Sequence, residues 1–156
     1  NGSGKSTLLR CLAGLFEADE GVIQHAVGLL YMGHRPGLNE LLSPLENLRW
    51  CAGLQERDVS PETLLSAIHS VGLDRYKDAP CRTLSAGQMR RAALARLCVS
   101  ESRLWLLDEP MTSLDDDAVA LVRDLIAKHR SAGGGCICAT HVKLEFPQTR
   151  VLELGA

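Results

Sequence analysis

The sequence predicts an α/β fold in which a mainly parallel sheet carries an inserted helical subdomain. Short apolar segments alternate with amphipathic helical segments at both ends of the 156-residue chain, as in proteins whose parallel strands are joined by helices. From residue 38 to residue 100 the pattern is helical and lacks the sustained heptads of a coiled coil. We therefore expect a discontinuous core, residues 1–33 and 101–156, and a helical subdomain, residues 34–100.

The first part of the core should contain one helix and two short strands. A helix is expected from about Lys5 to Gly14, because leucines recur at helical spacing and glycine is favoured just after a last turn. Residues 22–23 and 28–32 are short apolar segments that fit strands.

Serine residues mark the starts of three helices in the middle of the chain. Proline follows the first two serines, and an acid or amide stands three residues after the first and the third, as in a capping box. These predicted N-caps are Ser43, Ser60 and Ser85. Trp50, on the first of the three helices, is expected in the core, and so is Trp105 further along the chain.

The last part of the chain should return to strands around one more helix. Residues 104–107 fit a buried strand, and residues 136–140 and 151–154 fit two further strands. The helix between the first two begins with aspartates at 115–117 and ends with basic residues at 128–130, which is the charge order that the helix dipole favours.

Composition limits the classes of function. Lys and Arg number 17 against 19 Asp and Glu, so the net charge of −2 provides no broad basic surface for nucleic acid. No apolar run approaches the ~18 residues of a membrane span, so a membrane role should be peripheral. The six cysteines lack CxxC spacing and lie mostly in apolar stretches, which favours reduced, packed thiols.

The first seven residues fit a phosphate-binding loop. They match the Gly-x-x-x-x-Gly-Lys-Ser/Thr pattern except for its first two positions, so the chain is expected to be an N-terminally truncated fragment. Glycines let backbone N–H groups surround phosphate oxygens, and the following helix presents its positive end to the same anion. Lys5 would reach the terminal phosphates and Ser6 would bind Mg²⁺. An ordinary Gly/Ser turn before a helix is the alternative. The candidate nucleotide-binding residues are Asn1, Gly2, Ser3, Gly4, Lys5, Ser6 and Thr7.

Two carboxylates follow the apolar segment at 104–107. In enzymes with such a loop, the first acid, here Asp108, holds Mg²⁺, and the second, here Glu109, can take a proton from the attacking water. Paired acids also occur simply where a helix begins, but their combination with the phosphate loop favours the catalytic interpretation.

Residues 84–88 read Leu-Ser-Ala-Gly-Gln and should form a second anion-binding helix N-terminus. The three motifs, in this order, resemble the ATP-binding cassette (ABC) family, whose Leu-Ser-Gly-Gly-Gln signature is matched except at Ala86. The resemblance implies a P-loop NTPase core that uses ATP and Mg²⁺. It also implies a head-to-tail homodimer, in which the signature of one subunit covers the γ-phosphate held by the other. The signature residues acting in trans would be Ser85, Ala86, Gly87 and Gln88. Arg90, Arg91 and Arg96 on the same helix are expected to face solvent or another subunit.

Three further positions can be compared with the ABC family one at a time, of which two match it and one departs. Asp115 stands in the segment 113–115, where the family has its D-loop, which also acts in trans. His141 follows the strand at 136–140, at the family's switch histidine, which contacts the γ-phosphate. His34 lies thirteen residues before Asn47, where the family's transporters usually carry the glutamine of the Gln loop. The resemblance therefore implies Glu109, His141 and His34 as catalytic residues and Ser6 and Asp108 as Mg²⁺ ligands.

The histidine at position 34, in place of the usual glutamine, narrows the resemblance to one group within the ABC family. The Tyr-x-Gly-His-x-Pro-Gly stretch at 31–37 is similar to the ATPase subunits of the haem exporter of the cytochrome c maturation system. This implies an ATP-hydrolysing subunit of an ABC-type haem exporter in c-type cytochrome biogenesis, peripheral on the cytoplasmic face of the inner membrane. Separate transmembrane subunits and haem-handling partner proteins would complete the complex, without nucleic acid. The residue that stacks on adenine in the family would lie upstream of Asn1.

Other classes of function stay open. The chain could serve an ABC transporter with a different substrate. A non-transport ABC ATPase of the DNA-repair type would carry a long coiled coil between the phosphate loop and the signature, and the interval from Lys5 to Ser85 has none. A binding module without catalysis is disfavoured by Lys5, Asp108, Glu109 and His141.

Overall fold

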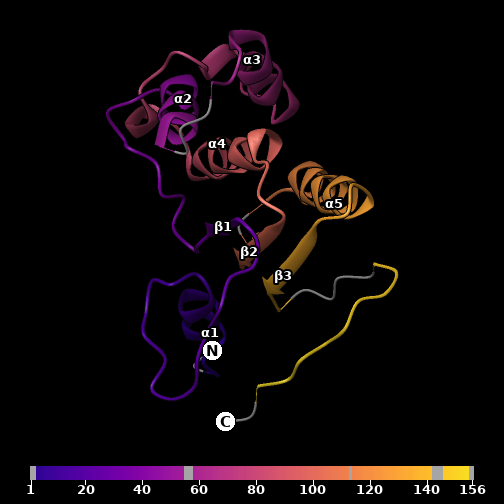
Figure 1. The fold of residues 1–156 in the computed structure, drawn as a ribbon. Coiled ribbons are helices and arrows are strands. Elements are labelled where there is room, and N and C mark those ends of the chain that lie inside the picture. Colours follow the sequence, from indigo (N-terminus) through magenta and orange to yellow (C-terminus); the bar gives the residue numbers. More distant parts are fainter. Residues whose placement is uncertain (1–2, 55–57, 113, 142–145, 155–156) are drawn as a thin grey trace.

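Three parallel strands form the centre of the computed structural model, which describes residues 3–54, 58–112, 114–141 and 146–154 (Figure 1). The strands are β1 (Leu29–Met32), β2 (Leu104–Asp108) and β3 (Gly135–Ala139), and their order in the sheet is β1-β2-β3. Both pairs are parallel, with Leu30 opposite Trp105 and Trp105 opposite Cys136. The predicted parallel α/β fold is confirmed.

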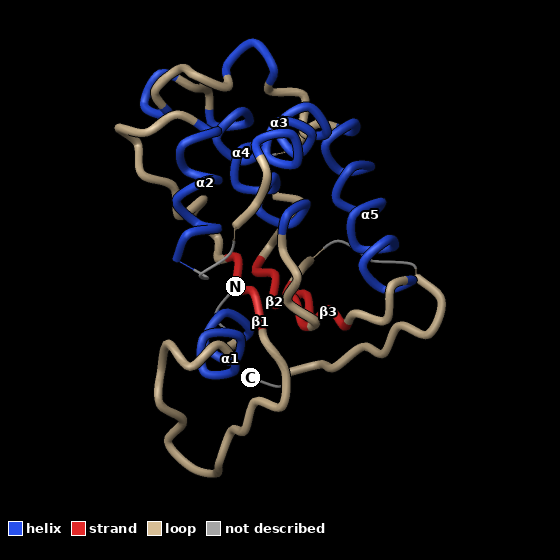
Figure 2. Tube along the Cα trace, turned by 45° about the horizontal axis from the view of Figure 1, so that its top comes forward, coloured by secondary structure: helices blue, strands red, loops and turns tan. Residues whose placement is uncertain are grey.

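Alternation along the strands creates two hydrophobic cores, one on each face of the sheet. Helix α1 (Lys5–Leu12) covers one face, where its Leu9 packs with Leu106 and Ala139. Trp105 and Leu107 point to the opposite face and join the larger core. Helices α4 (Ala86–Val99) and α5 (Asp116–Ser131) lie on that side, away from α1 (Figures 1 and 2).

Helices α2 (Pro44–Leu54) and α3 (Pro61–Ser70) pack beyond α4 and share the larger core with it. Two short 3₁₀ helices, Asp74–Tyr76 and Cys81–Thr83, connect α3 to α4. Buried Asn47 of α2 donates its amide to the carbonyls of Asn39 and Ser43 and accepts the Asn39 N–H, so it fixes the loop before α2.

The predicted helix starts are confirmed by their capping hydrogen bonds. Ser43 Oγ accepts from the Glu46 N–H at 3.2 Å while Glu46 returns a carboxylate oxygen to the Ser43 N–H. Ser60 caps α3 by accepting the Thr63 N–H. A capping residue of this kind stabilises a helix by about 1 kcal/mol.

Three predictions about the periphery are wrong. Residues 22–23 and 151–154 form no strand, and Val22 and Val151 are exposed because neither segment is paired with a strand of the sheet. Trp50 is 52% exposed, since it lies on the side of α2 away from the buried Leu48. Within the described ranges, no helix is both long enough and apolar enough to span a membrane.

Candidate active site

The carboxyl ends of the three strands gather the predicted catalytic residues. Parallel strands end at the same edge of a sheet, and in open α/β sheets ligands bind at this edge. His34 follows β1, Asp108 and Glu109 end and follow β2, and His141 follows β3. The topology therefore brings together residues that are far apart in the sequence.

The predicted phosphate-binding loop leads into α1. Gly4 is the N-cap of this helix and adopts φ +78°, a left-handed conformation that favours glycine. It provides no side-chain cap, so it leaves the first N–H groups of α1 available to an anion. Lys5 Nζ donates to Ser3 Oγ at 2.8 Å, so the ammonium folds back over the loop. Thr7 is exposed on α1, and Asn1 and Gly2 lie outside the described residues.

Ser6, in the first turn of α1, contacts Asp108 at the end of β2. Ser6 Oγ donates to Asp108 Oδ1 at 3.0 Å, and the Asp108 side chain is buried. The other carboxylate oxygen, Oδ2, is also buried and has no hydrogen-bond partner in the described structure. An ionised oxygen without a partner is costly to bury, and a cation would satisfy it. A hydroxyl and a carboxylate are oxygen ligands of the kind that Mg²⁺ prefers, so this pair fits a Mg²⁺ site.

Glu109 occupies a different environment although it adjoins Asp108. Its backbone has φ +50°, a left-handed conformation that costs a non-glycine residue about 1–3 kcal/mol. Its Oε1 lies 3.3 Å from His141 Nε2, and its Oε2 accepts from Thr112 Oγ1 at 3.3 Å. The Glu109 side chain is 18% exposed and that of His141 57% exposed, so both can reach a bound ligand.

Thr112 is a site residue that the sequence analysis missed. It stands three residues after Glu109, and its backbone N–H also donates to the Glu109 carbonyl at 3.2 Å. Its position in the turn after a predicted catalytic acid is the signal that could have identified it.

His34 reaches this edge through its backbone. Its side chain is exposed, and its carbonyl accepts a hydrogen bond from Arg90 Nη1 at 3.1 Å. The prediction that Arg90 faces solvent or another subunit is wrong, because Arg90 is only 5% exposed. Helical spacing gives the reason: Arg90 lies three and four residues before Ala93 and Leu94, on the buried side of α4.

The signature segment lies at the N-terminus of α4. Ser85 Oγ accepts the Gln88 N–H and Gln88 Oε1 accepts the Ser85 N–H, which completes the predicted capping box. Ser85 and Ala86 are exposed, and Gly87 and Gln88 are half-buried. No hydrogen bond described for these four residues reaches the phosphate-binding loop of the same chain.

Asp115 is connected to the signature helix. Its Oδ1 lies 2.7 Å from Arg91 Nη2 of α4 and also caps α5 by accepting the Ala118 N–H at 2.9 Å. The Ala118 N–H and then Arg91 lower the pKa of the Asp115 carboxyl, which therefore stays ionised. Residue 113, in the same predicted segment, lies outside the described residues.

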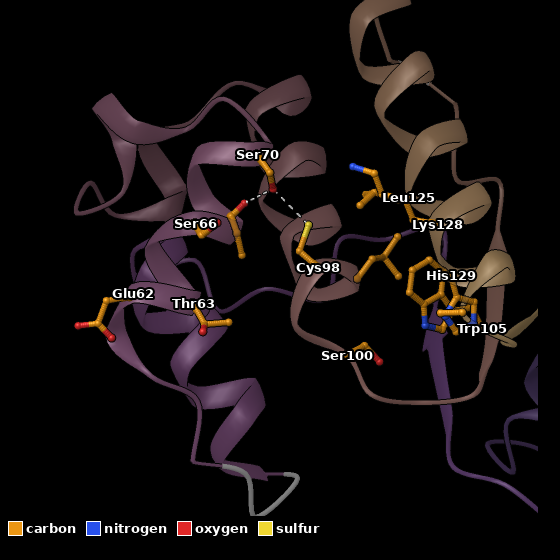
Figure 3. Close-up of a pocket in the computed structure, with 13 residues that line it drawn as sticks. Glu62, Thr63, Ser66, Ser70, Cys98, Ser100, Trp105, Leu125, Lys128 and His129 are labelled. Carbon is orange, nitrogen blue, oxygen red and sulfur yellow. Dashed lines mark hydrogen bonds between the residues drawn. The ribbon is translucent and has the colours of Figure 1, made fainter.

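A separate pocket of about 630 Å³ lies between α3, α4 and α5 (Figure 3). Trp105 stacks on His129 at one end of it, with ring centroids 3.8 Å apart. Burial raises the pKa of the Cys98 thiol in its wall, so this thiol is not an activated nucleophile. None of the predicted site residues lines this pocket.

Comparison with known proteins gives consistent findings. The sequence pattern of the ABC transporter family matches residues 1–112. The chain is 45% identical over 170 residues to the cytochrome c biogenesis ATP-binding export protein CcmA of Hahella chejuensis, covering 100% of the chain and 80% of that protein. It is 46% identical over 169 residues to the protein of the same name from Cupriavidus necator, covering 100% of the chain and 73% of that protein.

Solved structures of ATP-binding cassettes share the fold. One is the dimeric structure of a post-hydrolysis state of an ATP-binding cassette bound to ADP and Pi, with a TM-score of 0.80 and 23% identity, over 90% of this chain and 71% of that one. Another is an ATP-binding subunit of an ABC transporter, with a TM-score of 0.80 and 24% identity, over 91% of this chain and 65% of that one.

Proposed function

The chain belongs to the ABC transporter family and to its group of cytochrome c biogenesis ATP-binding export proteins, and on that basis we propose that it is the ATP-hydrolysing subunit of a haem exporter complex. The complex would act in c-type cytochrome biogenesis. The observation that carries the ATPase part is the meeting of the Ser6–Asp108 pair and the Glu109–His141 pair at the carboxyl edge of the sheet. The haem exporter part rests on the relatives.

In the proposed reaction, the phosphate-binding loop receives the ATP phosphates at the uncapped N-terminus of α1. The Lys5 ammonium would exchange its contact with Ser3 for the terminal phosphates and balance their charge. Ser6 Oγ and Asp108 would hold Mg²⁺, which neutralises charge on the phosphates during phosphoryl transfer.

Glu109 would accept a proton from the water that attacks the γ-phosphate. Its Oε1 faces the imidazole of His141 and its Oε2 is held by Thr112, so the carboxylate is oriented by two neighbours. His141 is exposed enough to contact the γ-phosphate as well, which suits the role of switch histidine. A base held in this way contributes roughly 10²- to 10⁴-fold to the rate of a reaction.

The proposed working unit is a head-to-tail homodimer. The exposed residues Ser85 and Ala86, together with Gly87, Gln88 and Asp115, would reach the nucleotide of the second subunit. The Arg91–Asp115 pair supports this arrangement, because it holds the signature helix and the D-loop aspartate together as one surface.

The remaining parts of the proposal concern the complex. Residues 1–33 and 101–156 would act as the ATPase core, and residues 34–100 as a subdomain that contacts separate transmembrane subunits. The subunit would be peripheral on the cytoplasmic face of the inner membrane, with haem carried by its partners. Exposed Trp50 and Leu54 on α2 support a contact of this kind.

Complementation tests this proposal. The full-length gene is expressed in a bacterium that lacks its own exporter ATPase, and haem bound covalently to c-type cytochromes is measured by in-gel peroxidase staining. We expect restoration by the wild type and none by Lys5→Ala, which lacks the charge that faces the phosphates. Restored ATPase activity without restored cytochromes would instead support an ABC ATPase with another substrate.

A further inference from the structure

Arg90 is the most deeply buried charged side chain on α4 and connects three segments of the chain. Its Nη1 donates to the carbonyls of Gly33 at 3.2 Å and His34 at 3.1 Å. Its Nη2 donates to the carbonyl of Glu109 at 2.7 Å and makes a longer contact of 3.5 Å with that of Asp108. One guanidinium therefore joins the signature helix, the loop after β1 and the turn after β2.

Burying the charged guanidinium of Arg90 costs free energy. Burial lowers the pKa of the guanidinium, and the charges of Asp108 and Glu109 oppose that effect. Arginine nevertheless stays protonated in proteins, so the burial must be offset by acceptors. Here the acceptors are backbone carbonyls, while Nε is buried without a partner in the described structure. A planar fork of donors can serve two pairs of carbonyls at once, whereas a lysine ammonium cannot.

The backbone of Glu109 requires hydrogen bonds that hold it in its unusual conformation. Glu109 has a left-handed backbone, and conformations of this kind persist only where the surroundings fix them. Arg90 Nη2 donates to the Glu109 carbonyl, and the Glu109 N–H donates to the Ala139 carbonyl at 2.8 Å. Both peptide groups next to the Glu109 Cα are therefore fixed, and they determine where the carboxylate points relative to His141.

We propose that Arg90 is a positioning residue that sets the Glu109 carboxylate for hydrolysis by holding the backbone of Glu109 and His34 against the signature helix. The inference rests on the proposed ATPase function. It concerns a residue whose two Nη groups donate to backbone carbonyls, so that it would act on hydrolysis through the groups it holds.

The decisive variants keep a polar group at this buried place. Arg90→Ala would remove a donor from each of these carbonyls and risks unfolding, so Arg90→Lys and Arg90→Gln are made in the full-length protein. Since a misplaced catalytic group loses roughly 10- to 100-fold in rate, we expect kcat to fall by that factor. The dissociation constant for ATP should stay within about threefold, because Lys5 and Ser6 are not touched. Arg96→Lys is the matched control on the same helix, since the Arg96 side chain forms no hydrogen bond within the described structure.

A double-mutant cycle with Glu109→Gln separates positioning from general stability. If Arg90 acts through the Glu109 carboxylate, Arg90→Lys should cost little further activity in single-turnover assays of the Glu109→Gln protein. An undiminished loss in that background, a wild-type kcat for Arg90→Lys, or a parallel loss of ATP binding would overturn the proposal. If Glu109→Gln itself hydrolyses ATP at the wild-type rate, the proposed function fails, and the role of Arg90 fails with it.

Discussion

The carboxyl edge of the sheet buries charged side chains, whereas the outer surface of α2 exposes apolar ones. At the edge, Asp108 and Arg90 are charged and buried. On α2 and the loop before it, Trp50, Leu54 and Leu41 are apolar and 52%, 67% and 71% exposed. Burying charge and exposing large apolar side chains both work against stability. The difference supports the two proposed uses, chemistry at the carboxyl edge of the sheet and partner contact on α2.

Replacement of the proposed base, Glu109, should have the largest effect. Glu109→Gln preserves the volume of the side chain and its hydrogen bond from Thr112 but cannot accept the proton from water, so hydrolysis should slow by roughly 10²- to 10⁴-fold. ATP binding should be intact, because the loop and Ser6 are unchanged, so an ATP-bound dimer should accumulate. Steady-state hydrolysis and size-exclusion chromatography with ATP measure the two effects.

Glu153→Gln is a control outside the site, because Glu153 lies in the irregular segment near the end of the described chain. A Glu109→Gln protein that hydrolyses ATP at the wild-type rate would show that the general base does not lie at the carboxyl edge of the sheet.

Loss of the hydroxyl that meets Asp108 should have a smaller effect. Ser6→Ala removes one of two proposed Mg²⁺ ligands and leaves both carboxylate oxygens of Asp108 without a partner among the described residues. The Mg²⁺ concentration for half-maximal hydrolysis should therefore rise about 10- to 100-fold, as for a lost supporting ligand. Ser6→Thr keeps the hydroxyl and should stay near wild type. A titration of hydrolysis against Mg²⁺ checks this, and identical curves for Ala and Thr would place the metal elsewhere.

The grouping of residues at the carboxyl edge of the sheet could be predicted from the sequence, because the parallel topology determines where each strand ends. Apolar segments followed by His34, Asp108 and His141 predict a shared edge once the strands are parallel, and the capping pattern at Ser85 places the signature at a helix start. Local patterns and the rule that parallel strands end together place these residues at one edge, whereas the choice of His34 and His141 as site residues came from the resemblance to the ABC family.

The features that were missed depend on long-range packing. The spacing of Arg90 fits the buried stripe of α4, but a charge on that stripe can be tolerated only because carbonyls from two distant loops converge on it. The left-handed backbone of Glu109 is set by the same contacts. Trp50 was predicted in the core because hydrophobicity alone does not say which face of α2 is covered.

Changes to the α2 surface should uncouple the complex without affecting the chemistry. Trp50 and Leu54 are four residues apart and lie on the same side of the helix. Trp50→Ser with Leu54→Ser should leave basal hydrolysis within about twofold and stability nearly unchanged, as for most surface substitutions. Stimulation of hydrolysis by the transmembrane subunits and formation of c-type cytochromes should be lost.

Leu65→Ser is the matched control, because Leu65 is 43% exposed on a different helix, α3. An equal loss of stimulation in the control would mean that any exposed apolar residue of the helical segment matters. A loss of basal hydrolysis in the double variant would show that α2 supports the ATPase core instead.

The smallest effect is expected at His34, where the two regions meet. Its carbonyl is held by Arg90 beside Glu109, and the chain after it leads directly to α2. Because the backbone contact does not depend on the side chain, His34→Gln should retain basal hydrolysis within about threefold, and the amide can replace one imidazole hydrogen bond. His34→Ala should retain basal hydrolysis less well and lose most stimulation by the transmembrane subunits, since it removes the side chain proposed to act at the Gln-loop position, on the loop that leads to α2. Basal and stimulated hydrolysis of the two variants are compared with wild type. Full stimulation of His34→Ala would show that the loop backbone held by Arg90, and not the histidine, carries any communication between the edge and α2.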